Sequence, residues 1–289
     1  MWAGYPRNAW TRVVENAHLG VAMRKKIFGE GAERMVSVFR LVDPNTLMFV
    51  GPEMVAKQSR FVCEEDNHDL QKFHESFCET QTKAQEFAVK FNKKLATLPG
   101  FNHTIPLISF LECFVFVVND ARLGKSGLLV EKMVDPHKYK KWNGNCGYVE
   151  GQAPTDHITP GLQDLNIIEE CDEEMEDEDS EEEDVDRRSA FYQNEKINVT
   201  DIPQAFSHFT YNITRRKKLV CDLQGVLNTA DSHNNVFELT DPVIHHKSDT
   251  GRKHVYGRTD HGKRGMHNFF KTHECTNLCR MLRRTWSSK

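Results

Sequence analysis

An acidic run divides this chain into two parts. Residues 169–186 contain 14 acidic residues and no basic one. A segment of this kind repels itself and has little apolar surface to bury, so it does not join a packed core. We therefore expect a solvated, disordered insertion over about residues 160–195, with the folded elements on either side of it. The total of 289 residues leaves enough chain for one large domain or for two lobes with their own cores.

Outside the acidic run, the chain is basic. The chain holds 42 acidic and 38 basic residues, so 28 acidic residues remain outside the run and the balance there is +10. The run could shield this basic body within the same molecule, recruit a basic partner, or serve only as a spacer. Ser180, within the run, has the acidic surroundings of a casein-kinase-type phosphorylation site.

Neither a membrane segment nor a secretion signal is visible. The sequence has no stretch of about 18 apolar residues. Its first residues, MWAGYPRNAW, lack the basic start and apolar centre of a secretory signal. We expect no membrane partner and a cytoplasmic, reducing location. The eight cysteines are then expected to be free thiols, with Cys113 and Cys221 buried because their neighbours are apolar.

The part before the acidic run reads as strands around one long helix. Apolar residues three and four positions apart predict a helix over residues 66–98, which Pro99 and Gly100 end. The DPN sequence at residues 43–45 predicts a turn. Apolar runs and alternation predict strands at residues 29–42, 46–57, 107–118 and 127–134.

The part after the run is shorter. Residues 218–226 (KLVCDLQGV) predict a strand, and residues 265–282 predict one terminal helix. On a strand, alternate side chains point to the same face, so Asp222 and Gln224 could reach one site. Gly225 would let the backbone turn or approach a ligand closely.

A candidate metal site lies near the C-terminus. His273, Cys275 and Cys279 fall within seven positions, and on a helix the two cysteines would share a face. A structural zinc site needs four protein ligands, whereas a catalytic one uses three and keeps an open position. Two buried cysteines beside a core histidine would explain the same pattern without a metal. The histidines that could supply a fourth ligand are His208, His245, His246 and His254.

Several segments, taken in order, resemble the alpha-kinase family of atypical protein kinases. They are IPQAFSHFTY (202–211), KLVCDLQGV (218–226), LTDPVIHH (239–246) and FFKTHECTNLC (269–279), together with VAK (55–57), VEKMV (130–134) and WNGNCG (142–147). The resemblance extends from about residue 10 to about residue 280. It implies an α+β, bilobal kinase fold, with an N-terminal lobe over residues 10–130 and a C-terminal lobe over residues 131–289.

The resemblance also implies a closed, structural zinc site in the C-terminal lobe. Its four ligands would be His208, His273, Cys275 and Cys279. The metal would tie the terminal helix to the segment that precedes the 218–226 strand.

ATP and Mg²⁺ are the other cofactors that the resemblance implies, bound between the lobes. Lys57 would contact the phosphates, and Asp222 would orient or deprotonate the attacking hydroxyl. Gln224 and Asp241 would hold the magnesium ion, which prefers oxygen ligands. The remaining matches are Glu131 and Met133 where backbone groups read the adenine edge, Asn143 and Asn145 near the nucleotide, and Gly257 and Gly262 in a glycine-rich loop. A role in forming a turn would explain Asn143 and Asn145 equally well.

Three features depart from the family pattern. The glycine-rich loop contains Asp260 and His261, where relatives often have an asparagine and an apolar residue. The link over residues 227–238 is longer than usual, so Asp241 must reach the metal across a longer loop. The acidic run is not a family motif.

We expect a serine/threonine protein kinase that transfers the γ-phosphoryl group of ATP to a protein substrate, with threonine favoured. A catalytically weakened kinase fold kept as a scaffold is an alternative. A zinc-dependent nucleic-acid-binding module would make use of the basic body and of the RRKK sequence at residues 215–218. That sequence is expected in a hairpin turn with no stacking aromatic platform, so no nucleic-acid partner is predicted.

Overall fold

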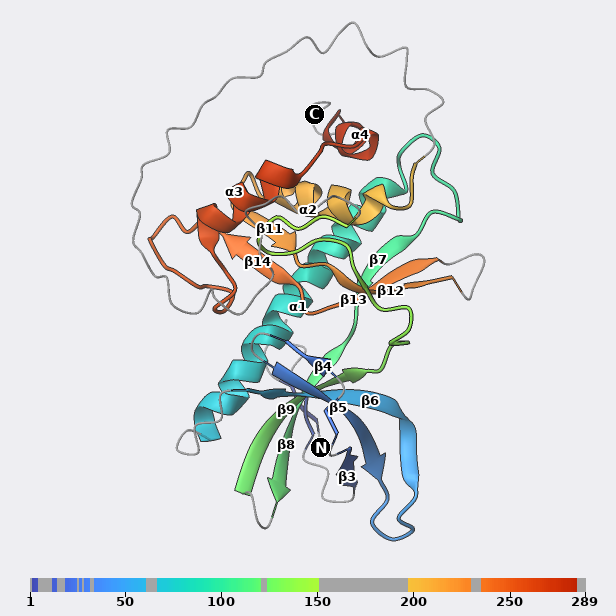
Figure 1. Cartoon of the computed structure of the whole chain (residues 1–289), viewed down its shortest axis with the longest axis vertical. Coiled ribbons are helices and arrows are strands. Elements are labelled where there is room, and N and C mark those ends of the chain that lie inside the picture. Colours follow the sequence, from blue (N-terminus) through green and yellow to red (C-terminus); the bar gives the residue numbers. More distant parts are fainter. Residues whose placement is uncertain are drawn as a thin grey trace, which may run out of the picture.

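In the computed structural model, the described residues are 2–4, 12–14, 19–24, 26–27, 29–31, 34–60, 67–120, 124–150, 197–229 and 235–284. The acidic run, Ser180 and the insertion predicted at about residues 160–195 lie outside them. Two lobes lie one above the other, and the long helix α1 (Asn67–Leu95) reaches from one lobe into the other (Figure 1).

The first lobe is built mainly of strands. Its elements, besides α1, are β1 (Trp2–Gly4), β2 (Arg12–Val14), β3 (Gly20–Met23), β4 (Gly29–Glu30), β5 (Arg34–Val42), β6 (Phe49–Ser59), β8 (Cys113–Asp120) and β9 (Gly124–Lys132). The second lobe contains β7 (Leu107–Phe110), β10 (Lys140–Lys141), α2 (Asp201–Ile213), β11 (Lys218–Cys221), β12 (Gln224–Asn228), β13 (Val236–Thr240), β14 (Val243–His246), α3 (Gly262–Thr272) and α4 (Asn277–Arg284).

The first-lobe sheet is antiparallel, in the order β3-β5-β6-β9-β8, and β4 also pairs with β5. The predicted turn between β5 and β6 is confirmed, since the Asp43 carboxylate accepts a hydrogen bond from the Asn45 N–H at 2.8 Å. Such a side-chain contact to the backbone two residues on is typical of aspartate-initiated turns. Strand β6 pairs with β5 on one side and with β9 on the other, which places Lys57 on a central strand opposite Leu129.

Helix α1 confirms the predicted long helix. Its apolar residues recur every three or four positions, and Ala84, Phe87, Ala88, Phe91 and Leu95 are buried, as the period of a helix with one packed face requires. The helix packs against β8 and β9 of the first lobe and against β7 and α2 of the second. Phe91 meets the rings of Phe206 and Phe209 edge-on, with ring centroids 5.4 and 5.3 Å apart. These contacts make α1 part of both cores.

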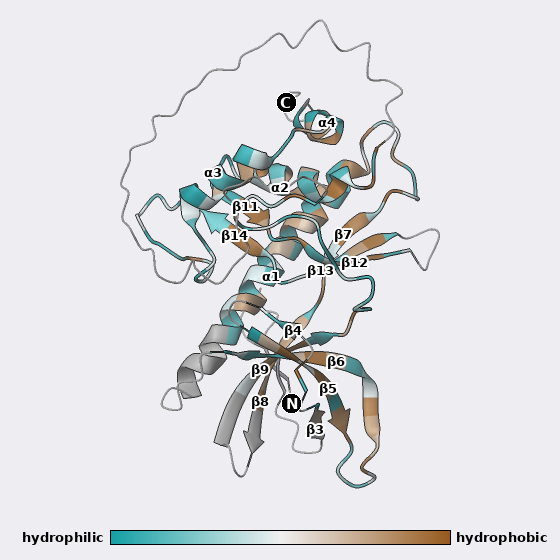
Figure 2. Ribbon diagram, viewed as in Figure 1, coloured by the Kyte–Doolittle hydropathy of each residue, from teal (hydrophilic) through white to brown (hydrophobic). Residues whose placement is uncertain are grey.

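The second lobe has a four-stranded sheet in the order β10-β12-β13-β7 and a separate pair, β11-β14. Apolar residues of α1, α2 and this sheet form the largest core, and strands β7 and β12 of the sheet are mostly brown in Figure 2. Strand β7 runs parallel to β13, although β7 precedes the lobe boundary predicted after residue 130. That boundary falls inside β9, and it remains a prediction.

Two strands predicted as continuous are broken, and each half joins a different sheet. Residues 107–118 form β7 in the second lobe and β8 in the first, with residues 111 and 112 between them. Residues 218–226 form β11 and β12, because Asp222 adopts a left-handed φ of 60° that ends the first strand. The predictions of single strands were therefore wrong at these two places, and also at residues 29–42, which form β4 and β5, an antiparallel pair.

The predicted terminal helix is also two helices. Helix α3 ends at Thr272, and the next residue, His273, is extended with a ψ of 114°. Helix α4 starts at Asn277, so Cys275 lies in the connection rather than on a helix face. The shared helix face expected for Cys275 and Cys279 is therefore wrong.

Residues 215–218 do not form a hairpin turn. Residues 215–217 lie in the connection from α2 to β11, and Lys218 begins β11; Arg215 and Arg216 both have positive φ, of 52° and 61°. Among the described helices, none is both long enough and apolar enough to cross a membrane.

Candidate active site between the lobes and candidate metal centre

A buried lysine connects the two lobes. Lys57 Nζ forms ion pairs with Glu131 Oε1 at 2.5 Å and with Asp241 Oδ2 at 2.8 Å, and it donates to Thr240 Oγ1 at 2.9 Å. Glu131 lies on β9, whereas Thr240 ends β13 and Asp241 follows it. The lysine side chain is 4% exposed, so these charges interact with little screening by water.

Arg34 completes this group, which we call the inter-lobe charge cluster: Arg34, Lys57, Glu131, Thr240 and Asp241. The Arg34 guanidinium lies 2.6 Å from Asp241 Oδ1, so each oxygen of that carboxylate faces a cation. Burial alone would raise the pKa of Asp241, but Arg34 and Lys57 outweigh it and hold this pKa below its usual value. Asp241 is therefore ionised at neutral pH.

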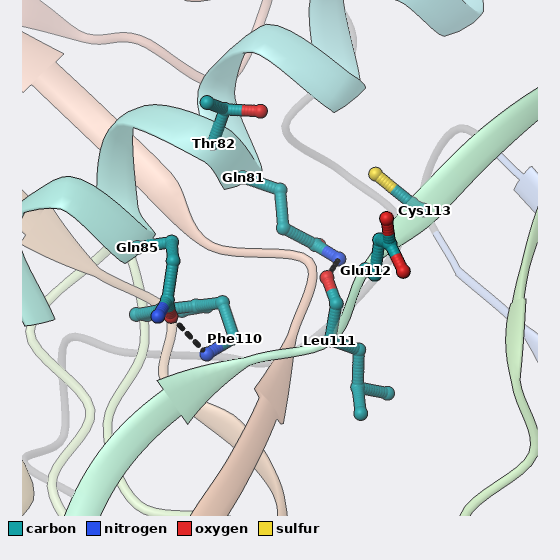
Figure 3. A pocket seen from close by; sticks show the side chains of 7 residues that line it. All are labelled: Gln81, Thr82, Gln85, Phe110, Leu111, Glu112 and Cys113. Atoms are coloured by element: carbon teal, nitrogen blue, oxygen red, sulfur yellow. Dashed lines mark hydrogen bonds between the residues drawn. The ribbon is translucent and has the colours of Figure 1, made fainter. Parts of the chain in front are cut away.

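Gln81 of α1 fixes the backbone beside this cluster. Its amide oxygen accepts the Asp241 N–H at 3.0 Å, and its amide nitrogen donates to the Leu111 carbonyl at 2.6 Å. Figure 3 shows Gln81 reaching from α1 toward Leu111, in a small pocket that α1 forms with the β7–β8 connection. In the same view, Gln85 accepts the Phe110 N–H at 2.7 Å. The helix thus positions Asp241, whose own φ of 52° is left-handed.

Asp222 and Gln224 meet, although not in the way the sequence suggests. They do not share a strand face, because Asp222 lies in the break between β11 and β12. Gln224 Nε2 donates to Asp222 Oδ2 at 3.2 Å, and Lys141 of β10 forms an ion pair with Asp222 Oδ1. Burial raises the pKa of Asp222, Lys141 opposes this effect, and the nearby Asp241 charge adds to it. A carboxyl whose pKa is raised is better suited to accept a proton.

Asn143, near Asp222, holds the backbone. Asn143 is fully buried: it donates to Gln204 and Ser207 at 3.1 and 3.0 Å and accepts the Leu223 N–H at 3.0 Å. It therefore positions the backbone next to Asp222 and does not face a cleft.

Gly225 allows a close approach between strands. A Cβ at this position would lie 2.1 Å from the Glu238 carbonyl oxygen of β13, and its φ of 148° is one that other residues rarely adopt. Glycine is thus required at residue 225 by the close packing of β13, and no ligand is needed to explain it.

The glycine-rich loop is held by one of the residues that departs from the family pattern. Asp260 is buried and accepts the backbone N–H groups of His246 and Gly262, both at 2.9 Å, and of Tyr256 at 3.2 Å. Gly257 has a left-handed φ of 88°. The Asp260 carboxylate therefore orders the turn between Gly257 and Gly262.

Other predicted site residues are placed but not joined to the charge cluster. Met133 follows β9 and is half-buried, and its adenine-contacting role remains a prediction, as does that of Glu131. The carbonyl of Asn145 accepts a hydrogen bond from His245 Nε2 at 3.1 Å. Part of the long link, residues 230–234, lies outside the described residues, and Asp241 nevertheless reaches the charge cluster.

The four predicted zinc ligands converge at the other end of the second lobe. His208 Nδ1 lies 3.0 Å from His273 Nε2, Cys275 Sγ lies 3.5 Å from His208 Nδ1, and Cys279 Sγ lies 3.7 Å from His273 Nε2. A tetrahedral zinc ion, with Zn–N of about 2.0 Å and Zn–S of about 2.3 Å, places its donors roughly 3.3 to 3.8 Å apart. The donor atoms of His208, His273 and Cys279 all lie within 4.8 Å of one another, and these three suit a zinc ion, whereas Cys275 Sγ approaches His208 but lies outside that set.

The two cysteines of the cluster have opposite pKa shifts. Contacts with Cys279, His208 and His273 lower the pKa of Cys275 to about 2, while the contact with Cys275 raises the pKa of Cys279. The cluster therefore favours a thiolate, the form that binds a metal. The break between α3 and α4 is what lets His273 and Cys275 turn toward His208 on α2.

Sequence reasoning missed four residues of the candidate active site: Arg34, Gln81, Lys141 and Thr240. Thr240 precedes Asp241 and could have been suspected from that position. The others lie on distant strands or on α1 and show no local pattern, so only the tertiary structure reveals them. The buried free thiols expected at Cys113 and Cys221 are confirmed.

Comparisons with known proteins agree with the geometry. The chain is 27% identical over 234 residues to alpha-protein kinase vwkA of Dictyostelium discoideum and 29% identical over 257 residues to alpha-protein kinase 1 of the same organism. These matches cover 80% and 88% of this chain but only 27% and 13% of the relatives, so the chain spans a minor part of their length.

A solved structure shares the fold. The alpha-kinase domain of myosin-II heavy chain kinase A in complex with AMP-PNP aligns with a TM-score of 0.56 at 21% identity, covering 92% of this chain and 87% of that one. The model of the alpha-kinase family matches residues 29–163 and 180–279. The chain belongs to the alpha-kinase family.

Proposed function

We propose that this chain is an ATP-dependent serine/threonine protein kinase whose active site lies between the lobes. The observation that carries the proposal is the position of Lys57, buried between Glu131 of one lobe and Asp241 of the other. Lys57 supplies a fixed cation for phosphates, and the Asp241 carboxylate and the Gln224 amide supply oxygen ligands for a metal ion. Family membership supports the same reaction class.

Each residue has a distinct role in the proposed reaction. Asp222 orients the substrate hydroxyl and accepts its proton as the oxygen attacks the γ-phosphorus and the bond to the bridging oxygen of ADP breaks. Lys57 stabilises charge on the phosphate oxygens. Bound Mg²⁺ would neutralise phosphate charge, with Asp241 and the Gln224 amide oxygen as its protein ligands. Lys141 positions Asp222 through their ion pair.

The zinc quartet is proposed to be structural. With four protein donors, the coordination sphere leaves no open position for a substrate or water. The ion would connect α2 to the α3–α4 connection and so support β11, the strand that α2 packs against and that Asp222 follows.

One observation favours the scaffold alternative. Both oxygens of Asp241 are already in ion pairs, so binding of a metal ion must compete with Arg34 and Lys57. In a scaffold, this arrangement would persist in the presence of ATP and Mg²⁺.

Transfer of labelled phosphate from ATP to a threonine peptide with neutral flanks tests the proposal. Wild type is compared with Asp222→Asn and with the exposed control Asp135→Asn, with zinc content measured in all three. Label in the wild type and the control, but not in Asp222→Asn, would establish the kinase. Absence of label in all three, at equal zinc content, would favour the scaffold.

A further inference from the structure

A basic surface lies beyond the ends of β11 and β14 that are remote from Asp222, and the proposed reaction gives no role to its lysines and arginines. It combines two segments, residues 215–218 and residues 247–264. Together they contain ten lysines and arginines and two acidic residues, a balance of +8. The cations are Arg215, Arg216, Lys217, Lys218, Lys247, Arg252, Lys253, Arg258, Lys263 and Arg264. Figure 2 shows the connection from β14 to α3 as mainly hydrophilic.

The two segments are held together, so the surface is a single one. The Lys247 N–H donates to the Lys217 carbonyl at 3.0 Å, and the Lys217 ammonium pairs with Asp249. Lys218 Nζ lies 4.8 Å from the centre of the Tyr256 ring. The acidic residues do not neutralise the surface, because Asp249 is matched by Lys217 and the carboxylate of Asp260 is buried in backbone hydrogen bonds.

The connection from β14 to α3 is ordered before any partner binds. Asp260 holds its second half, as described above, and the Ser248 hydroxyl accepts the N–H groups of Thr250 and Arg252 at 3.2 and 3.1 Å. Eight of the ten cations are exposed, and Lys218 and Lys247 are half-buried. Ordered, exposed cations of one sign focus the electric field and attract an anionic partner at little further entropic cost.

The surface lies within reach of the proposed catalytic residue. Strand β11 runs from Lys218, which pairs with His246, to Cys221, which is followed by Asp222. At about 3.3 Å per residue, Lys218 is roughly 13 Å from Asp222, the length of about four residues of extended peptide. A substrate with its hydroxyl at Asp222 could therefore extend onto the basic surface.

The composition of the surface favours an acidic peptide over other anions. Tyr256 is its one Phe, Tyr or Trp residue, and Lys218 lies over that ring, so there is no platform on which nucleic-acid bases could stack. Val255 is its one exposed large apolar residue, too little for insertion into a membrane surface.

We propose that this surface selects protein substrates that carry a cluster of aspartates or glutamates about four or more residues from the phosphorylated Ser or Thr. The inference rests on the proposed kinase function and specifies its substrate class. The acidic side chains would pair with the exposed arginines and lysines, which affects substrate binding more than the chemical step. Because the contacts are exposed, salt should weaken them.

Two threonine peptides test the inference: one has a block of six glutamates starting about four residues from the threonine, and the other has glutamines in their place. Wild type should phosphorylate the glutamate peptide with a kcat/KM at least about tenfold higher, mainly through a lower KM, and the difference should shrink as salt rises. Arg252→Glu/Lys253→Glu should abolish the preference and leave activity on the glutamine peptide unchanged. Lys90→Glu/Lys93→Glu, on the exposed part of α1, is the matched control and should keep the preference.

A binding measurement separates this inference from the proposed function. Fluorescence anisotropy of a glutamate peptide with alanine in place of threonine should show salt-sensitive binding that Arg252→Glu/Lys253→Glu abolishes. Such binding without any phosphorylation would support the surface and refute the kinase proposal. Equal kcat/KM for both peptides would leave the kinase intact and overturn the inference. Tighter binding of a single-stranded oligonucleotide than of the glutamate peptide would also overturn it.

Discussion

The inter-lobe charge cluster and the His/Cys cluster are both sets of ionisable side chains, but they are assembled differently. Three of the four His/Cys residues lie within seven positions, next to a helix break. The charge cluster draws Arg34, Lys57 and Glu131 from three strands of the first lobe, and Thr240 and Asp241 from the end of β13. The first pattern can be read from spacing, whereas the second exists only once the two lobes are packed together.

The two clusters should also differ in what their loss does. The charge cluster buries charges that serve the proposed reaction, whereas the His/Cys cluster is expected to serve the fold. Variants at each cluster should therefore separate activity from stability. The largest expected effect is loss of the fold, and the smallest is a change in the pH dependence of stability.

The largest effect is expected at the metal centre. Removing zinc with a strong chelator, or by Cys279→Ser, should unfold the α3–α4 region, since structural zinc contributes on the order of 10 kcal/mol in small peptides. Zinc content measured by mass spectrometry, together with thermal unfolding, checks this expectation. Cys146→Ser, at an exposed thiol outside the quartet, should retain the metal. An unchanged melting temperature after complete removal of zinc would show that the ion does not hold the fold.

Breaking the charge cluster should reduce stability less. Lys57→Met leaves Glu131 and Asp241 without their shared cation, and the loss of one partner of a buried ion pair costs about 3–5 kcal/mol. Denaturant unfolding measures the loss. The double variant Lys57→Met/Glu131→Gln should recover part of it, because one uncompensated charge is removed. No recovery would mean that Glu131 is not destabilised by the loss of Lys57.

At Asp222, activity and stability should separate completely. Asp222→Asn should lower the rate of phosphoryl transfer by about 10²- to 10⁴-fold, the usual contribution of a general base. Its melting temperature should hardly change, because asparagine tolerates the left-handed φ of 60°. Asp222→Val at the same position should also lose stability, by about 1–2 kcal/mol. Wild-type activity in Asp222→Asn would remove this residue from the proposed mechanism.

The smallest effect is expected in the pH dependence of stability, to which Asp241 and Asp222 should contribute with opposite signs. The pKa of Asp241 is lowered in the folded state, so its contribution to stability is present above the ordinary value of 3.8 and is lost as the pH falls below it. The pKa of Asp222 is raised, so its contribution is largest below 3.8 and declines as the pH rises through the higher folded value. Stability of Asp241→Asn and Asp222→Asn relative to wild type, measured between about pH 3 and 6, should therefore change in opposite directions. Parallel profiles would contradict the assigned environments.

The sequence predicts those parts of the molecule that depend on local patterns. The period of α1, the turn at Asp43 and the strand character of β5 and β6 follow from residues close together in the chain. The breaks at Asp222 and at His273 do not, because tertiary contacts override local strand or helix preference there. Asp222 and His273 are also the points where the candidate sites are built, so local rules fail where function is expected.

The residues of the charge cluster could be proposed only through family resemblance. Nothing around Lys57 or Glu131 distinguishes them from an ordinary lysine and glutamate on strands. Their burial against each other is decided by the β6–β9 pairing and by the position of β13. Arg34 and Gln81 do not lie in any of the segments that resemble the family, and only the fold brings them to Asp241.

The pairing of β7 with β13 has a consequence for exchanging parts between relatives. Residues 107–110 precede two strands of the first lobe, yet they form an edge of the second-lobe sheet and pair with residues 236–239. A chimera joined at residue 130 would take β7 from one parent and β13 from the other, and it would also cut β9. Recombination between alpha-kinases should therefore be tolerated only when residues 107–110 and 236–239 come from the same parent.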